Sequence, residues 1–416
     1  MNSSASERIQ EPTPVAAIGA GNRMRTYMHY VAQNPDKVRL VAIAEPDAAR
    51  REAMRRDFGL DGDAVFEGYD SLFASGIRFD AVFIATPGNE HYRPAMMALE
   101  HGCHVLLEKP IAQNYEECLA VAELAKKNGL TVSVCHVMRH HPMFLKIKEL
   151  IDSGNYGRII TVSHTEEVGI DRATHSYVRG TLNNERTSNP MLLDKSCHDV
   201  DFLLWITGAH CRRISSFGSR MWFRGENAPS GSADRCIVCP LEGRCPYSAV
   251  DLYRRRKEWT RNFIPGPGQT VDDIVELQLR EGRFGRCVYR CDNDVVDNQV
   301  VTMQMTDGMI VTLTMNVFTQ RDCRTIEIGM TEGQITCNGM TVNARNFRTR
   351  RTETYDFSPL ARVGFHGGAD LALVEEFIDA VRTGSKPVTS IEGALEAHRI
   401  IFEAERSRHT GETVSL

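Results

Sequence analysis

The chain has 416 residues, of which 42% are hydrophobic, and its formal net charge at pH 7 is −5. This length and apolar content are enough for two hydrophobic cores, so we expect two domains. The slight negative charge provides no basic surface for nucleic acid, and no apolar run approaches the roughly 18 residues of a membrane span, so we expect neither partner.

The N-terminal segment MNSSASERIQEPTP lacks the charged-then-apolar layout of a secretory signal. We interpret residues 1–13 as a disordered lead-in and expect a cytoplasmic protein. The chain also contains 12 cysteines. Without a secretory signal, these indicate free thiols or metal ligands rather than a disulfide framework.

A short apolar run then leads into the stretch GAGNR and a segment with helical periodicity. This order is typical of the turn that binds dinucleotide phosphates, because Gly19 permits a tight turn and Gly21 lets the backbone approach a pyrophosphate. Met24 stands where the third glycine of the fingerprint would be, so the motif alone fits an ordinary strand–turn–helix equally well. We assign Asn22 and Arg23 to the same predicted cofactor site.

The next apolar run, residues 39–44, is followed directly by Glu45. A carboxylate at the end of the second strand accepts hydrogen bonds from the adenosine ribose hydroxyls. It would also repel the 2′-phosphate of NADP. Glu45 therefore favours NAD as the cofactor.

Further apolar runs of strand length follow at residues 81–85, 104–107 and 131–135, separated by stretches with helical periodicity. This alternation predicts a parallel, doubly wound sheet, whose ligands bind at the carboxyl ends of the strands. At or near those ends we assign five residues to the cofactor: Thr86, Pro87, His91, Glu108 and Lys109.

In order and spacing, GAGNR, FIATPGNEH, LLEKP and a later Asp-x-x-x-His pattern resemble the glucose–fructose oxidoreductase, inositol dehydrogenase and rhizopine catabolism (Gfo/Idh/MocA) family. The resemblance covers nearly the whole chain, and EKP is its most specific element. It implies an α/β protein with an NAD-binding Rossmann domain at residues 14–136. The remaining residues, 137–416, would form a substrate-binding and oligomerisation domain on a large open, mainly antiparallel sheet.

The pattern of the C-terminal part agrees with this architecture. Strand-like alternation occurs at residues 300–305, 309–317 and 325–330, and helical periodicity at residues 369–382 and 391–406. By resemblance we expect hydride transfer between NAD and a sugar, sugar acid or polyol, and a homo-oligomer that is a dimer or a tetramer.

The resemblance also implies site residues. Lys109 would be a catalytic or substrate-positioning group, and Asp194 and His198 the substrate-binding acid/base pair. Oxidation of a secondary alcohol needs a base for the hydroxyl proton, and histidine titrates near neutrality. Lys195 departs from the commonest family pattern, in which a small or apolar residue follows the aspartate, and is a third candidate proton carrier. We interpret Asp199 as part of a helix start that favours the helix dipole.

Other polar residues are candidates for substrate contact, although a capping or loop-stabilising role is an equal alternative. They are His136, Arg139, His175, Tyr177, His366 and Asp370.

A Gly/Pro-rich insertion at residues 227–247 contains Cys236, Cys239 and Cys245. Two closely spaced thiolates can form a metal knuckle with a third nearby, and Cys287 and Cys291 are the thiols available for the fourth position, to which we assign Cys287. We expect a structural zinc site, with free reduced thiols as the alternative.

Two catalytic functions fit these residues. The first is an NAD-dependent oxidoreductase. The second is a redox-neutral glycoside hydrolase that keeps NAD bound and works by oxidation at C3, elimination, water addition and reduction, with Lys195 and His175 as further acid/base groups. A non-catalytic dinucleotide-binding regulator is disfavoured by the EKP lysine and the Asp/His pair.

Overall fold

The computed structural model describes residues 11–266 and 268–416, so residues 1–10 of the predicted lead-in lie outside the described residues. The chain forms two compact units. The first consists of Met1–Ala112, Glu116–His140 and Gly364–Glu392; the second consists of Gln113–Tyr115, His141–Val363 and Gly393–Leu416.

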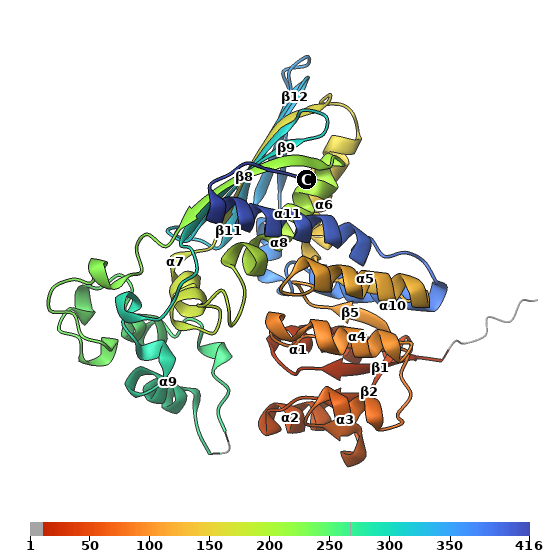
Figure 1. Cartoon of the computed structure of the whole chain (residues 1–416), viewed down its shortest axis with the longest axis vertical. Helices are drawn as coiled ribbons and strands as arrows, with labels where there is room; N and C mark the ends of the chain where they lie inside the picture. The colour runs from red at the N-terminus through yellow and green to blue at the C-terminus, as the bar shows by residue number, and fades with distance from the viewer. Residues whose placement is uncertain (1–10, 267) are drawn as a thin grey trace, which may run out of the picture. The chain divides into compact units, whose positions relative to one another are not determined.

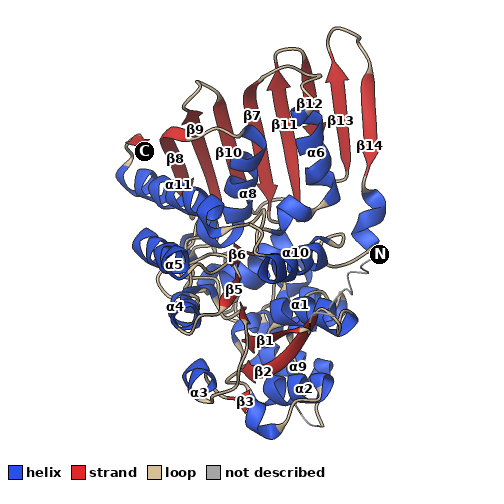
Figure 2. Ribbon diagram, turned by 90° about the vertical axis from the view of Figure 1, so that its right-hand side faces the viewer, coloured by secondary structure: helices blue, strands red, loops and turns tan. Residues whose placement is uncertain are grey.

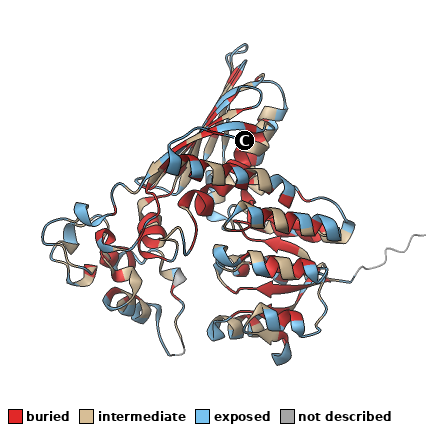
Figure 3. Ribbon diagram, in the orientation of Figure 1, coloured by how far each residue is buried: buried red, intermediate tan, exposed pale blue. Residues whose placement is uncertain are grey.

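The first unit contains a six-stranded parallel sheet in the order β3-β2-β1-β4-β5-β6. This order confirms the predicted doubly wound sheet. The strands are β1 (Thr13–Ile18), β2 (Val38–Ala44), β3 (Val65–Phe66), β4 (Ala81–Ile84), β5 (His104–Leu107) and β6 (Val132–Val134). Buried residues run through these strands (Figure 3) because helices cover the sheet.

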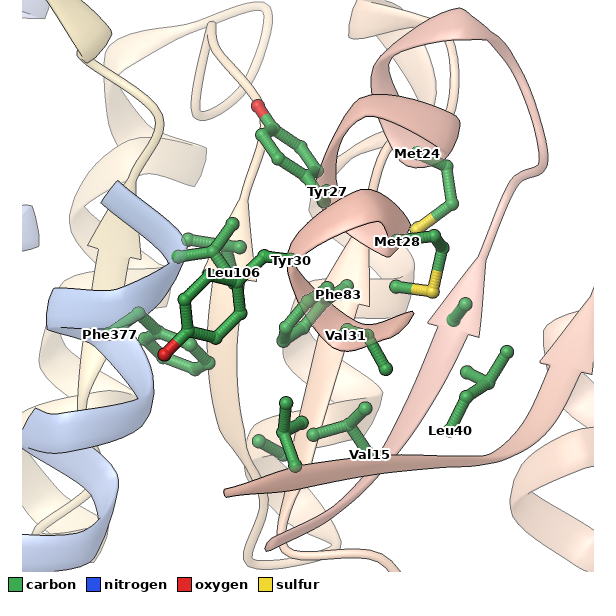
Figure 4. Close-up of a cluster of buried hydrophobic side chains, with 14 of the residues drawn as sticks. Val15, Met24, Tyr27, Met28, Tyr30, Val31, Leu40, Phe83, Leu106 and Phe377 are labelled. Atoms are coloured by element: carbon green, nitrogen blue, oxygen red, sulfur yellow. The ribbon is translucent and has the colours of Figure 1, made fainter. Parts of the chain in front are cut away.

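The helices of this unit follow the strands in the expected alternation. They are α1 (Asn22–Gln33), α2 (Ala48–Phe58), α3 (Tyr69–Ala74), α4 (Tyr92–Glu100) and α5 (Tyr115–Asn128), with short 3-10 helices η1 (Gly62–Ala64), η2 (Gly88–Glu90) and η3 (Val137–His140). Helix α1 packs on the sheet through buried side chains such as Met28 and Val31, which lie near Leu40 and Val15 (Figure 4).

Helix α10 (Ala369–Thr383) also belongs to the first unit, although the sequence places it in the second domain. It contacts α1 and β5. Its Phe377 ring lies 5.8 Å from the ring of Phe83 on β4 (Figure 4). The apolar face of α10 therefore completes the core over the parallel sheet.

The second unit contains a nine-stranded sheet in the order β14-β13-β12-β11-β7-β10-β9-β8-β15 (Figure 2). Only the β7–β10 pair is parallel, as predicted for a mainly antiparallel sheet. The strands are β7 (Ile159–Glu167), β8 (Cys211–Ser219), β9 (Asn298–Met305), β10 (Ile310–Asn316), β11 (Cys323–Met330), β12 (Gly333–Cys337), β13 (Thr341–Asn346), β14 (Thr352–Asp356) and β15 (Val414–Ser415).

Helices α6 (Pro142–Asp152), α8 (Met191–Thr207) and α11 (Ile391–Thr410) lie along one face of this sheet (Figure 2). Strand residues alternate between this buried face and an open one. On the open face, Phe217 of β8 pairs across the ladder with Val300 of β9, and the two are 69% and 40% exposed.

Two irregular regions complete the second unit. The short helix α7 (Ile170–Arg172) runs directly into a π-helix, η4 (Ala173–Arg179). The connection between β8 and β9, residues 220–297 (the insertion), is much longer than the predicted residues 227–247 (Figure 1). It carries its own hydrophobic core. Its helices are η5 (Gly225–Asn227), η6 (Cys236–Val238), η7 (Glu242–Arg244), η8 (Val250–Arg255), η9 (Thr260–Asn262), α9 (Val271–Arg280), η10 (Arg283–Gly285) and η11 (Val288–Arg290), and one more 3-10 helix, η12 (Ser358–Arg362), follows β14.

Among the described residues, no helix combines the length and the apolar character needed to cross a membrane.

Candidate functional site

The glycine turn after β1 has the geometry predicted for a phosphate-binding turn. Gly19 adopts φ +88°, and a Cβ there would lie 2.7 Å from the carbonyl oxygen of Ala85, so no other residue fits without strain. A Cβ at Gly21, the N-cap of α1, would meet nothing within 4 Å. No side chain of the described residues caps this helix, which leaves its first N–H groups for an anion.

The position of the third fingerprint glycine is filled by Met24, whose side chain is fully buried in the core beneath α1. Close packing of this helix on the sheet is therefore achieved with methionine in place of glycine. Asn22 is the first residue of α1, beside the open approach to Gly21.

Glu45 follows β2 and is 5% exposed. One carboxylate oxygen accepts a hydrogen bond from the Ala20 N–H at 2.6 Å, and the other accepts one from the Asp47 N–H at 2.9 Å. The carboxylate thus braces the glycine turn. Each oxygen retains a second lone pair that is available to a ribose hydroxyl.

An ion network joins α1, the end of β5 and the start of α10. Arg23 Nε lies 2.5 Å from Glu108 Oε1, and Arg23 Nη2 lies 2.7 Å from Asp370 Oδ1. The Tyr27 hydroxyl also donates to Glu108, and His366 Nδ1 lies 2.8 Å from Asp370 Oδ2. Two predicted cofactor residues and two predicted substrate residues are therefore brought together within the first unit.

Both carboxylates of this network are stabilised in their charged form. Burial acts to raise the pKa of Glu108, but the cations Arg23 and Lys109 outweigh it and lower the pKa. Burial likewise opposes ionisation of Asp370, yet its hydrogen bond to His366 and the charge of Arg23 bring its pKa to about 2. Both groups are negative at neutral pH.

Lys109 lies in the turn after β5. Its N–H donates to Glu108 Oε2 at 3.1 Å, its side chain is half-buried, and the Lys109–Pro110 peptide bond is cis. His91 lies between two backbone carbonyls, with Nδ1 2.6 Å from Pro110 O and Nε2 3.0 Å from Thr86 O. Burial lowers the pKa of His91, which favours the neutral ring. A neutral imidazole carries one N–H, so it donates to one of these two carbonyls.

The remaining predicted residues of the first unit lie in loops at its strand ends. Thr86 is half-buried and Pro87 exposed after β4. His136 is fully buried just after β6, and Arg139 donates to the carbonyl of Val388 at 3.0 Å.

In the second unit, the start of α8 presents the predicted acid/base pair. Asp194 is 9% exposed and accepts a hydrogen bond from the Tyr177 hydroxyl at 2.7 Å. Burial and the charge of Asp194 raise the pKa of Tyr177, so the tyrosine remains a donor. His198 lies one helical turn beyond Asp194 and is half-buried.

Lys195 lies in a buried ion network. Its ammonium lies 2.7 Å from Glu166 Oε1 and 3.1 Å from Asp322 Oδ1. A protonated ammonium has no lone pair with which to take a proton from a substrate. Burial raises the pKa of Glu166 even though Arg324 and Lys195 flank it.

The helix-dipole interpretation of Asp199 is wrong. Asp199 is fully buried, 2.6 Å from Arg324 Nε and 2.8 Å from His164 Nε2. Although burial opposes ionisation, Arg324 and His164 lower the pKa of this carboxylate. Sequence reasoning missed Glu166, Arg324 and Asp322, because only the tertiary pairing of β7 with β11 brings them to α8.

His175 lies in the aromatic core of the insertion. Its ring stacks on Phe284 and Trp259 at centroid distances of 4.7 and 5.1 Å, and its Nδ1 lies 2.9 Å from the Tyr253 hydroxyl. Burial lowers its pKa to about 4. The structure therefore gives His175 a packing role and not a place beside Asp194.

Cys236, Cys239, Cys245 and Cys287 line one cavity of about 280 Å³ together with Arg179. The cysteines are free thiols, and burial raises the pKa of Cys245 and of Cys287. In the part of the chain that the structure describes, no group of three or more His, Cys, Asp or Glu side chains is arranged to hold a metal ion. The structure therefore does not support the predicted zinc site as a preformed centre.

Comparison with protein families gives a match over both units. Residues 14–136 match the oxidoreductase family with an NAD-binding Rossmann fold, and residues 144–238 match the Gfo/Idh/MocA C-terminal domain. The chain belongs to the Gfo/Idh/MocA oxidoreductase family.

Several curated proteins are similar to this chain at low identity. An uncharacterized oxidoreductase of Streptococcus pneumoniae is 27% identical over 59% of this chain and 64% of its own length. Inositol 2-dehydrogenase of Corynebacterium glutamicum is 27% identical over 47% and 54%, and 2,7-anhydro-N-acetylneuraminate hydratase of Mediterraneibacter gnavus is 24% identical over 56% and 59%. The chain thus matches between half and two thirds of the length of these relatives.

Two solved structures share the fold of nearly the whole chain. An oxidoreductase from Agrobacterium radiobacter in complex with NAD+, L-tartaric acid and magnesium has a TM-score of 0.71 at 17% identity, covering 97% of this chain and 98% of its own. Aldose-aldose oxidoreductase from Caulobacter crescentus has a TM-score of 0.69 at 15% identity, covering 98% and 100%.

The residues of the first unit fit NAD, the cofactor of this family model. Gly21 leaves room for a pyrophosphate at the N-terminus of α1, and Glu45 offers carboxylate oxygens at the end of β2.

Proposed function

We propose that the protein is an NAD-dependent oxidoreductase that transfers a hydride between the cofactor and a secondary alcohol of a sugar, sugar acid or polyol. The observation that carries this proposal is the glycine turn, open at Gly21 and braced by Glu45, in a chain of the Gfo/Idh/MocA family. The similarity to inositol 2-dehydrogenases supports a polyhydroxylated substrate.

The cofactor, when bound, supplies the hydride acceptor. The N–H groups at the start of α1 bind its pyrophosphate, and Gly21 keeps that approach open. Glu45 accepts hydrogen bonds from the ribose hydroxyls and disfavours a 2′-phosphate. Glu108 anchors the backbone of Lys109, which we assign to orienting the substrate hydroxyl.

We assign the proton to His198. As hydride leaves the carbinol carbon, the hydroxyl proton must pass to a base, and imidazole titrates near neutrality. Asp194, held by Tyr177, binds a substrate hydroxyl as an acceptor. Lys195 is left out of the proton pathway because Glu166 and Asp322 hold its ammonium.

The test is NADH formation, followed by absorbance, with a panel of free sugars, sugar acids and polyols. His198→Ala should lower kcat by about 100-fold or more, the usual contribution of a general base. His210→Ala is the matched control, because His210 lies exposed at the surface. Lys109→Ala should abolish activity while NAD binding is largely kept.

No NADH with any member of the panel would contradict the oxidoreductase proposal, as would an unimpaired His198→Ala enzyme. NAD binding measured by calorimetry on the same preparations separates a wrong reaction from a misfolded protein.

A redox-neutral glycoside hydrolase is the second candidate, favoured by the similarity to 2,7-anhydro-N-acetylneuraminate hydratase. Such an enzyme would oxidise C3, which acidifies the C2 proton, then eliminate the aglycone, add water and reduce the ketone again. It would release nitrophenol from nitrophenyl glycosides without added cofactor and without net NADH. Stoichiometric NADH with no nitrophenol would exclude it.

We also propose that the protein is a dimer or a tetramer that buries the open face of the nine-stranded sheet. The exposed Phe217–Val300 pair supports this, because paired apolar side chains on an open sheet face are stabilised by a partner surface.

A further inference from the structure

The turn before α10 is strained at two residues that are not glycine. Five consecutive residues, 364–368, have positive φ values, between 48° and 92°. Three of them are glycines, but Phe365 and His366 are not, and residues with a Cβ are strained in this conformation. Strained residues persist where their contacts hold them, and they cluster at ligand sites. The strain at His366 therefore points to a role for its side chain.

Contacts within the first unit hold this turn in place. The Phe365 ring lies 4.8 Å from the ring of His29 on α1. The Phe365 carbonyl accepts a hydrogen bond from the Asp370 N–H at 3.3 Å, and the His366 carbonyl accepts one from the Ala369 N–H at 3.3 Å. The turn is thus fixed against α1 and against the first turn of α10, which defines the position of His366.

His366 and Asp370 form a dyad that leaves one ring nitrogen to a ligand. Asp370 is 1% exposed and ionised at neutral pH, so its carboxylate can only accept hydrogen bonds. The contact of 2.8 Å therefore requires a proton on Nδ1 of His366. The imidazole is 59% exposed, and in the neutral ring the other nitrogen, Nε2, accepts a hydrogen bond.

The strand order places the dyad away from the adenosine end of the cofactor site. Glu45 follows β2 on one side of β1, whereas Glu108 follows β5 on the other side. In Rossmann domains the adenosine ribose binds at the end of the second strand and the pyrophosphate at the turn after the first, so the nicotinamide half extends to the other side. Arg23 bridges Glu108 and Asp370, which assigns the dyad to that half.

The charges around the dyad favour a neutral hydroxyl over a phosphate. Glu108 and Asp370 are both ionised, and they share the guanidinium of Arg23. A phosphate at the dyad would lie beside the Asp370 carboxylate and would be repelled by it. The ribose of the nicotinamide half instead offers hydroxyl donors, which suit a lone pair on Nε2 of His366.

We propose that His366 binds the ribose of the nicotinamide half of NAD through Nε2, in place of the substrate contact expected from the sequence. Asp370 is a positioning residue, because its buried carboxylate holds the ring by Nδ1 and leaves Nε2 to the ligand. The inference rests on the cofactor site of the proposed function and not on its hydride transfer.

The test is calorimetric titration of the full-length protein with NAD, ADP-ribose and ADP. ADP-ribose contains the second ribose but lacks nicotinamide, and ADP lacks both. His366→Asn should weaken the binding of NAD and of ADP-ribose about fivefold, the effect of one hydrogen bond, and should leave ADP binding unchanged. Asparagine tolerates positive φ, and its amide can still donate to Asp370 without reaching the position of Nε2.

Three further variants serve as controls. His366→Gln has a longer amide that reaches the position of Nε2, so it should bind NAD more tightly than His366→Asn. Glu45→Gln, on the adenosine side, should weaken the binding of all three ligands. His101→Asn, at an exposed histidine of the same unit that follows α4, should weaken none of them.

Unchanged NAD affinity in His366→Asn would overturn the proposal, and so would an equal loss of affinity for ADP, which has no second ribose. Loss of NAD affinity with unaffected ADP-ribose binding would move the contact to the nicotinamide ring and overturn the assignment to the ribose. A wild-type protein that binds none of the three ligands would contradict the cofactor site itself. Tight NAD binding without NADH formation would contradict only the hydride transfer of the proposed function.

Discussion

Lysine is a side-chain type that can carry protons in enzymes, but the structure places Lys195 in ion pairs with carboxylates. The sequence offers an ammonium between an aspartate and a histidine of a family motif. The structure surrounds it with Glu166 and Asp322, which come from β7 and from the segment before β11. Sequence spacing predicted the motif, but the ion pairs depend on strand pairing and were not predictable from it.

Lys195→Met should therefore destabilise the fold by about 3 kcal/mol, because it leaves the buried Glu166 carboxylate with one cation fewer. Urea unfolding measures the loss. NAD binding should be unchanged. A variant of native stability that loses kcat outright would mean that Lys195 takes part in the chemistry.

The glycine turn was predictable because its constraint is local. Gly19 has a positive φ and lies against Ala85, so it combines backbone strain with a steric limit. Gly76 provides a comparison, since it has φ +76° but a Cβ there would meet nothing within 4 Å.

Gly76→Ala should lower the free energy of unfolding by about 1 kcal/mol, because alanine is less stable than glycine in a left-handed backbone conformation. Gly19→Ala should cost more and should also weaken NAD binding, because the turn must shift away from Ala85 O. Calorimetric titration with NAD and thermal unfolding of both variants provide the comparison. If both substitutions changed the stability and the NAD affinity equally, contact with Ala85 would not explain the requirement for Gly19.

At the scale of elements, periodicity predicted several of the strands and helices. The alternation at residues 300–305, 309–317 and 325–330 corresponds to β9, β10 and β11, and the periodicity at residues 369–382 corresponds to α10. Periodicity identifies the apolar face of a helix without identifying its partner. The unit to which α10 belongs was therefore not predictable.

Asp370, which forms an ion pair between α10 and α1, has a measurable effect on stability. The pKa of Asp370 falls from 3.8 to about 2 on folding, which corresponds to about 2 kcal/mol of stability at neutral pH. Because the folded pKa is the lower one, this contribution is complete above about pH 4 and is lost as the pH falls toward 2.

Asp370→Asn should accordingly lower stability at pH 7 and flatten the decline between about pH 4 and pH 2, as measured by denaturant unfolding across this range. Asp379→Asn, at an exposed position of the same helix, is the control and should leave the pH profile as in wild type. If the stability of Asp370→Asn fell between pH 4 and pH 2 as steeply as that of wild type, other titrating groups would account for the acid dependence.

At the scale of the whole molecule, the proposed association of copies through the open sheet face can be tested by substitution. Phe217→Glu places a charge in the centre of the Phe217–Val300 pair and should shift the assembly to monomers. Light scattering after size-exclusion chromatography measures this shift. Phe347→Glu, at an exposed residue beyond β13, is the control, and equal masses for both variants would locate the interface elsewhere.

The return of α10 to the first unit also has a consequence for synthesis on the ribosome. The long segment between His140 and Gly364 belongs to the other unit, and its translation takes roughly 10 to 45 seconds. Until then, the nascent parallel sheet lacks the helix that covers Phe83 and Leu106. The growing chain therefore carries the apolar face around Phe83 and Leu106 without its covering helix until residues 369–383 have been translated.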